Sequence, residues 1–424
     1  MGNKIGRAIV DRIVRAHRAQ ETFHIFVLMP AVPAFAGDLK SDGALGTRAI
    51  MEFQYDSINR GGHSIIESLR QQGVDDPRRY INFYNLRNYD RINVSSTLGR
   101  VERESGVTYE AARREFDDRA ERGPDGRDYY DDGQGTRGDS QYRRYQEAAS
   151  RAEDKSWDSI AACYMDAGPD LHRVPWTGSP ESEMAAFVSE ELYIHSKVLI
   201  ADDHLVICGS ANLNDRSQLG DHDSEIAVVI EDPTPVESTM AGRPYTASAF
   251  ATSLRRQLFR KHLGLLPHQA PDRPDANWTP VDRDPNRYDW DSAADRLVRD
   301  PLGDGFMKLW RGTAKQNTDA FSKAFHPVPN DKVRTWDDYD SFFSRHFVIP
   351  GAEEKKGKKD DRTSRVDYGH VVPEEFPGGV RELKDCLGKI RGTLVEMPLD
   401  FLIDVKDLAK EGLSLNSLTD ELYT

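Results

Sequence analysis

Apolar residues recur at helical and strand periods through the first hundred residues. Ile5, Ile9 and Ile13 lie at helical spacing with charged residues between them, so residues 4–19 are predicted to form an amphipathic helix. The following run FHIFVLMP has strand composition and ends at a proline. Further helices are expected over 44–60 and 64–71, and YINFYNLR is expected to form a second strand. This alternation of helix and strand predicts an α/β fold.

The pattern changes twice further along the chain. Residues 105–158 are highly charged and nearly free of aliphatic side chains, so they cannot bury enough apolar surface to offset the entropy of ordering. We expect a disordered insertion there, helical in part. Strand patterns return in LYIHSKVLIADDHLVICGSANL and SEIAVVIED, and a helix is expected over 248–263. The chain therefore divides into residues 1–104 and 159–270 of one α/β domain, the insertion, and a C-terminal extension over 271–424.

One apolar run contains a histidine and a lysine two residues apart. Side chains two apart share a face of a strand, so His195 and Lys197 are predicted to project together from a buried strand. The turn-like residues 201–204 predict a hairpin that returns Gly209, Ser210 and Asn212 beside this strand. A lysine, a hydroxyl, an amide and a histidine suit a tetrahedral phosphate oxyanion, and the histidine can transfer protons or attack phosphorus. Phosphoryl chemistry is the favoured interpretation.

Composition narrows the class of protein. Lys and Arg number 57 and Asp and Glu 71, a net charge of −14 that argues against non-specific nucleic-acid binding. The three cysteines, Cys163, Cys208 and Cys386, form no C-x-x-C pair, which fits a reducing cytosolic setting without a thiolate zinc site. The apolar run FVLMPAVPAFAG is shorter than a membrane span. We therefore expect a cytoplasmic protein that associates with membranes peripherally.

The motif also carries a family resemblance. The segments HSKVLIAD and GSAN match the H-x-K-x4-D and G-S-x-N pattern of the phospholipase D superfamily. The runs NKIGRAIVDRIVRAHR, SANLNDRS, DSEIAVVIED and RGTLVEMPLDFL further resemble eukaryotic, fungal-type phosphatidylcholine-hydrolysing phospholipase D. A strand histidine satisfied by the backbone, beside a surface lysine, explains this combination less well.

The resemblance implies a fold, a reaction and a role for each matching residue. The fold is one of two pseudo-symmetric halves, a mixed sheet layered with helices, which corresponds to the catalytic domain. The reaction passes through a phosphohistidine to give phosphatidic acid and choline, or transfers the phosphatidyl group to an alcohol. By resemblance, His195 is the general acid and base, and Lys197, Ser210 and Asn212 bind phosphate oxygens. Glu225 orients the histidine, and Asp202 supports the catalytic motif as a structural partner.

The sequence departs from the family pattern in one respect. Of its 12 histidines, His195 alone is followed two residues later by lysine, so the family's first motif is absent from this chain. The implied partner is a second motif, from a missing N-terminal half or a homodimer partner, acting on a phospholipid substrate at a membrane surface. Two alternatives remain: a catalytically incomplete lipid- or partner-binding remnant, and a single-motif homodimeric phosphodiesterase.

The implied chemistry requires no metal or other cofactor. The acidic cluster of Asp221, His222, Asp223 and Glu225, near Asp202, Asp203 and His204, is an alternative metal site, but its spacing matches no recognised metal motif. Turn composition explains most of these residues.

Overall fold

A computed structural model describes most of the chain. The described residues are 3–33, 38–41, 44–92, 96–121, 140–152, 160, 165–166, 170–176, 178–267, 290–348 and 365–408.

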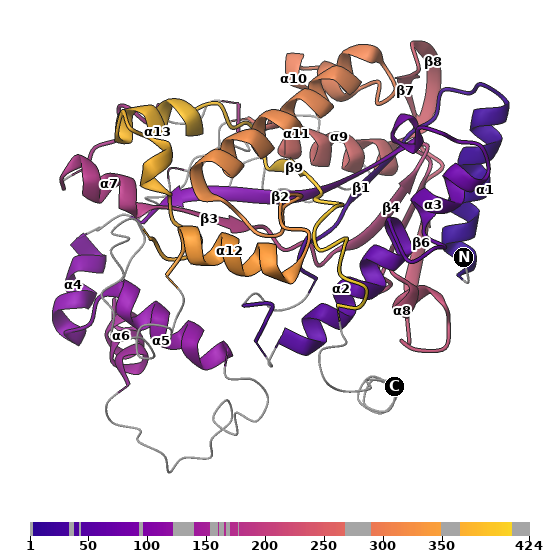
Figure 1. Cartoon of the computed structure of the whole chain (residues 1–424). Coiled ribbons are helices and arrows are strands. Elements are labelled where there is room, and N and C mark those ends of the chain that lie inside the picture. Colours follow the sequence, from indigo (N-terminus) through magenta and orange to yellow (C-terminus); the bar gives the residue numbers. More distant parts are fainter. Residues whose placement is uncertain are drawn as a thin grey trace.

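Helices and strands alternate through the first half, and helices dominate the second (Figure 1). The α-helices are α1 Lys4–Arg18, α2 Leu45–Ile58, α3 Ile65–Gln71, α4 Ser96–Ser105, α5 Tyr109–Glu121, α6 Gln141–Ser150, α7 Pro180–Ala186, α8 Asp215–Gln218, α9 Ala249–Leu263, α10 Ala293–Val298, α11 Asp304–Phe325, α12 Trp336–His346 and α13 Val380–Leu387. The strands are β1 Ile25–Leu28, β2 Ile81–Arg91, β3 Phe187–Glu191, β4 Lys197–Ala201, β5 Leu205–Gly209, β6 Ala227–Glu231, β7 Pro235–Met240, β8 Arg243–Ser248 and β9 Leu394–Glu396. The α/β prediction is confirmed.

A mixed sheet built around β2 forms the centre of the molecule. β1 pairs with β2 in parallel, from Ile25 opposite Ile81, and α2 and α3 lie in the crossover between them. β3 and β9 both pair antiparallel with β2. Figure 1 shows α9 and α11 on one side of this sheet and α2 and α12 on the other. Because β9 belongs to this sheet, part of the segment expected as a C-terminal extension is integral to the central layer.

Alternation along β2 explains how one strand supports two cores. Ile81 and Phe83 pack in a cluster with α1, α2 and α3. Tyr84 and Leu86 pack in a second cluster around Trp310 of α11, which is fully buried. Both faces of β2 are therefore apolar, as expected for a strand covered by helices on each side.

The charged insertion contains more helix than its composition indicates. Its described part forms α5 and α6, and the two helices pack against each other. Glu115 joins them, because its carboxylate accepts hydrogen bonds from the Ser140 hydroxyl at 2.6 Å and the Tyr142 amide at 2.8 Å. Polar capping thus orders helices that bury little apolar surface. The expectation of disorder for 122–139 and 153–158 lies outside the described residues.

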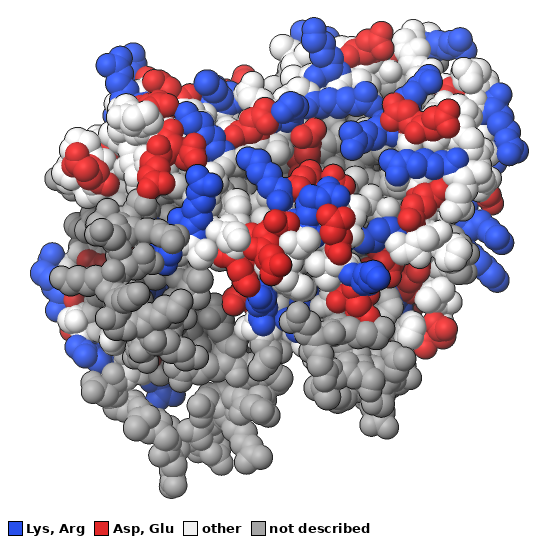
Figure 2. All heavy atoms as spheres, in the orientation of Figure 1, with Lys and Arg blue, Asp and Glu red and all other residues white. Residues whose placement is uncertain are grey.

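Charges of both signs are interspersed over the face drawn in Figure 2. Among the described residues, no helix is long and apolar enough to cross a membrane.

Candidate active site

The predicted hairpin is present. β4 and β5 pair antiparallel from Lys197 opposite Gly209 to Ala201 opposite Leu205, and β6 continues the sheet beyond β5. Asp202 and Asp203 form the turn with φ values of 48° and 56°. Two successive positive φ angles match the twist of paired strands, and aspartate tolerates this conformation better than most residues. The turn therefore sets the register that brings Lys197 beside the Gly-Ser segment.

His195 lies just outside the strand in which it was predicted. β4 begins at Lys197, and the His195 side chain is exposed, with its ring 6.0 Å from the ring of Tyr193 in a stacked arrangement. Ile194 packs against the core around Trp310, so neighbouring side chains do point in opposite directions. The prediction of a buried strand is wrong, because no described element covers this end of the hairpin.

Lys197 lies between a backbone carbonyl and an acidic side chain. Its Nζ donates a hydrogen bond to the carbonyl oxygen of His195 at 2.6 Å. Burial lowers the pKa of Lys197, while the charge of Glu225 raises it in part. The Lys197 ammonium is thus held by the backbone carbonyl of His195 and lies in the field of the Glu225 carboxylate.

Ser210 and Glu225 connect the hairpin to β6. The Ser210 hydroxyl donates a short hydrogen bond to the Glu225 carboxylate and accepts one from the Ile226 amide at 3.0 Å. Within the described residues no hydrogen bond joins Glu225 to His195, so its orienting role stays a prediction. Asn212 is exposed in the loop after β5.

Gly209 is required by the closeness of the neighbouring strand. A Cβ at this position would lie 2.5 Å from the carbonyl oxygen of Ile226, a backbone atom that cannot move away cheaply. A larger residue would push β6 away and separate Ser210 from Glu225. The glycine of the motif is therefore explained by strand packing as well as by access for an anion.

The two turn aspartates have different surroundings. Asp202, the aspartate of the H-x-K-x4-D pattern, is exposed at the far end of β4 from Lys197, and its carbonyl oxygen accepts the Tyr245 hydroxyl at 2.6 Å. Asp203 is buried and binds Arg255 of α9 through two hydrogen bonds of 2.6 and 2.7 Å. Asp203, which the motif does not mark, therefore anchors the hairpin to the rest of the protein.

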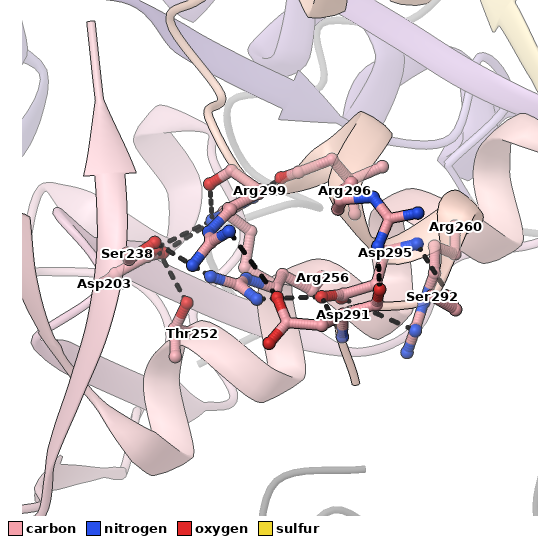
Figure 3. A network of polar contacts seen from close by, with 12 residues as sticks. Asp203, Ser238, Thr252, Arg256, Arg260, Asp291, Ser292, Asp295, Arg296 and Arg299 are labelled. Atoms are coloured by element: carbon pink, nitrogen blue, oxygen red, sulfur yellow. Dashed lines mark hydrogen bonds and ion pairs between the residues drawn. The ribbon is translucent and has the colours of Figure 1, made fainter. Parts of the chain in front are cut away.

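Figure 3 shows that this anchor belongs to a larger buried network. Thr252 also donates to Asp203, at 3.0 Å. On the same helix, Arg256 and Arg260 form ion pairs with Asp295 of α10 at 2.9 and 3.5 Å. The hairpin, α9 and α10 are consequently held together by paired buried charges.

Helix α8 is fixed by polar contacts to the N-terminal elements. The Asn3 side chain donates a short hydrogen bond to Asp215, and the Asp215 amide donates to the Ser57 hydroxyl at 2.8 Å. These contacts position the loop that carries Asn212, and no spacing pattern in the sequence predicts them.

The acidic residues considered as an alternative metal site have other partners. Asp223 binds Arg216 at 2.9 Å, Asp203 binds Arg255, and His204 lies 3.2 Å from the Ser248 hydroxyl. These carboxylates are neutralised by arginine.

The sheet that carries the motif is exposed on both faces. Val198 and Val228, which share one face, are 41% and 60% exposed. Leu199 and Val229, on the other face, are 49% and 60% exposed. Continuous apolar runs such as these are typical of strands buried on both faces. Within the described chain this sheet lacks the covering layers that its sequence predicts.

The chain is similar to known proteins over part or most of its length. Residues 166–279 match the sequence model of the family described as phospholipase D. Together with the relatives below, this match supports assignment of the chain to the HKD phospholipase D superfamily.

Relatives come from plants, mammals and an oomycete. The chain is 28% identical over 407 residues to phospholipase D zeta 2 of Arabidopsis thaliana, covering 96% of this chain and 27% of the relative. It is 28% identical over 423 residues to phospholipase D1 of Homo sapiens, covering 100% and 26%. Phospholipase D of Phytophthora infestans is 29% identical over 340 residues, covering 80% and 12%. The chain thus spans about a quarter, or less, of the length of these relatives, and the fungal-type assignment stays a prediction.

Proposed function

We propose that this chain supplies one half of a phospholipase D active site. The observation that carries the proposal is the register of the hairpin, which sets Lys197 opposite Gly209 and leaves Ser210 next to both. His195, Lys197, Ser210 and Asn212 then surround one exposed region that suits a phosphate diester. The proposed substrate is phosphatidylcholine at a membrane surface, and the products are phosphatidic acid and choline.

In the proposed reaction, a histidine of the motif that this chain lacks attacks phosphorus and forms a P–N bond while the P–O bond to choline breaks. His195 donates a proton to the leaving choline oxygen. His195 then takes a proton from water, and the water oxygen attacks phosphorus. The P–N bond breaks and phosphatidic acid is released. An alcohol that reacts in place of water gives the transfer product. Lys197 and Ser210 stabilise the charge that builds up on the phosphate oxygens.

The complementary motif comes from outside this chain in the proposal, either from an N-terminal half or from a second copy. The support is the apolar surface of β4 and β6, together with Ile226, which directly precedes β6 and is 79% exposed. Burying such a surface against a partner is favourable at about 25 cal/mol per Å² of apolar area. Membrane association is peripheral in this proposal, with the partner and the lipid surface completing the site.

Choline release from phosphatidylcholine vesicles tests the proposal. The chain is assayed alone and after co-expression with the region upstream of it that carries the other motif. Activity should require either pairing or self-association. His195→Asn should lower the rate by roughly 10²–10⁴-fold, the usual contribution of a general acid and base.

His204→Gln is the matched control, since His204 is an exposed histidine on the same hairpin. It should retain activity. Full activity in His195→Asn would overturn the assignment of His195.

The partner surface is tested separately by Ile226→Glu. This change should abolish pairing in sizing experiments without unfolding the chain, whereas Leu297→Glu, at a site that is 49% exposed on α10, should leave pairing intact. Equal behaviour of the two variants would contradict the proposed surface.

The incomplete surroundings of His195 favour one other candidate, a non-catalytic lipid-binding remnant. Vesicle sedimentation without choline release in any pairing would support it.

A further inference from the structure

Three side chains that could ligate a metal meet at a place unrelated to the hairpin. Glu110 comes from α5, and Asp367 and His370 come from the segment that precedes α13. One ligand atom from each lies within 4.8 Å of the other two. Glu110 lies more than 250 residues before Asp367 and His370 in the sequence, and the fold brings its carboxylate beside theirs. The cluster consists of one imidazole and two carboxylates.

The state of His370 is set by its backbone contact. The residue is only 8% exposed, and its Nδ1 lies 2.8 Å from the carbonyl oxygen of Ala185, which can only accept a hydrogen bond. Nδ1 therefore carries a proton, and in the neutral ring Nε2 presents its lone pair. Metal-bound histidines are usually fixed in this way, by a carbonyl on the other ring nitrogen.

The lone pair of Nε2 points toward carboxylate oxygens. Nε2 lies 3.7 Å from Glu110 Oε1, and within the described residues neither Nε2 nor the buried Glu110 Oε2 has a hydrogen-bond partner. A buried Nε2 of this kind, beside two partly exposed carboxylates, is satisfied by a cation that all three groups share.

The neighbouring arginines leave room for a metal ion. Arg114 donates two hydrogen bonds, of 2.5 and 3.2 Å, to Oδ2 of Asp367, and these leave the lone pairs of Oδ1. Arg113 Nε approaches Glu110 Oε2 only to 3.6 Å, beyond hydrogen-bond distance. Each carboxylate therefore retains an oxygen for a ligand.

We propose that Glu110, Asp367 and His370 form a binding site for a borderline divalent transition-metal ion of the Zn²⁺ class. One nitrogen and two carboxylate oxygens suit such an ion, whereas Mg²⁺ and Ca²⁺ prefer oxygen alone. The role is structural. The Ser189 amide donates to the Gly369 carbonyl at 2.8 Å, so the ion links α5 to β3 of the central sheet. In Figure 1, α5 lies with α4 and α6 at one end of the molecule.

Metal titration of the stripped, full chain tests this site. Calorimetry with Zn²⁺ and visible absorption with Co²⁺ should show one bound equivalent and a d–d band from a nitrogen- and oxygen-ligated ion. His370→Gln and Glu110→Gln should each weaken binding at least tenfold. His172→Gln is the control, because His172 is an exposed histidine also paired with a carboxylate, Asp385; it should bind like the unmodified chain.

Three results would overturn the proposal. One is the absence of stoichiometric binding, and another is unchanged binding in a folded His370→Gln variant. If that variant fails to fold, Glu110→Gln, whose side chain is 35% exposed, decides the question. The third is a ¹⁵N spectrum in which His370 is doubly protonated and does not respond to Zn²⁺, since a proton would then occupy the site.

Discussion

Replacing Asp203 should loosen the hairpin that carries the candidate site. Asp203 and Arg255 have side chains that are 1% and 7% exposed, and losing the aspartate leaves a guanidinium buried without its counter-charge. Breaking such a pair typically costs about 3–5 kcal/mol. Arg255 also donates to the Val298 and Arg299 carbonyls at 2.6 and 3.1 Å, so we expect the lower end, about 3 kcal/mol, for Asp203→Ala.

The assay is urea unfolding at pH 7, with Asp202→Asn as the control. Asp202 neighbours Asp203, is exposed and also has a positive φ, which asparagine tolerates. The control should change the free energy of unfolding by no more than about 0.5 kcal/mol. If the two variants lose the same stability, the anchoring role of Asp203 is refuted.

The same pair predicts a dependence on pH. Burial raises the pKa of Asp203, but the charge and hydrogen bonds of Arg255 outweigh burial, so the net pKa lies below the usual value. The stabilisation is complete above the ordinary aspartate pKa of about 3.9 and is lost as the pH falls through the lower folded value. Asp203→Asn should lack this loss below about pH 4.

Two further predictions concern a contact between α9 and the turn before β9. Gly392→Ala should lower the free energy of unfolding by more than about 3 kcal/mol, because φ is +63° and the new Cβ would lie 1.8 Å from the His262 carbonyl oxygen. Gly73→Ala, at φ +86° in open space, is the control and should lower it by only about 1–2 kcal/mol. Equal losses in urea melts would contradict this reasoning. Burial lowers the pKa of His262 to about 3, so its contribution to stability is complete above about pH 6.5 and falls by roughly 1.4 kcal/mol per unit as the pH drops toward 3. His262→Gln should remove this slope, and an unchanged slope would show that another group is responsible.

Local patterns predicted much of the fold. The helix expected over 4–19 is α1, the strand expected in FHIFVLMP contains β1, and the strand expected in YINFYNLR covers β2 from Ile81 to Arg87 but misses its last four residues. These elements have strong periodicity and pack against helices on nearby segments. The pairing of β9 with β2 was not predictable, because three residues carry too little pattern to identify a partner more than 300 residues away.

The candidate site was predictable as a set of residues but not in its surroundings. The spacing of His195, Lys197 and Ser210 gave the hairpin, because period-two alternation and turn chemistry act locally. The exposure of β4 depends on what covers the sheet, which no local pattern encodes. The anchoring role of Asp203 depends on Arg255, which lies 52 residues away on another element.

The position of β9 has a consequence for how the chain is made. β2 is complete once residue 91 has been synthesised, but the strand that pairs with its middle section lies at 394–396. The antiparallel partner of this section, which comprises Tyr84, Asn85 and Leu86, is therefore synthesised more than 300 residues later. Contacts at such separation slow folding, because a large loop must close before they form. We expect the nascent chain to expose this part of β2 until β9 has been synthesised, which makes it a natural binding site for chaperones during synthesis.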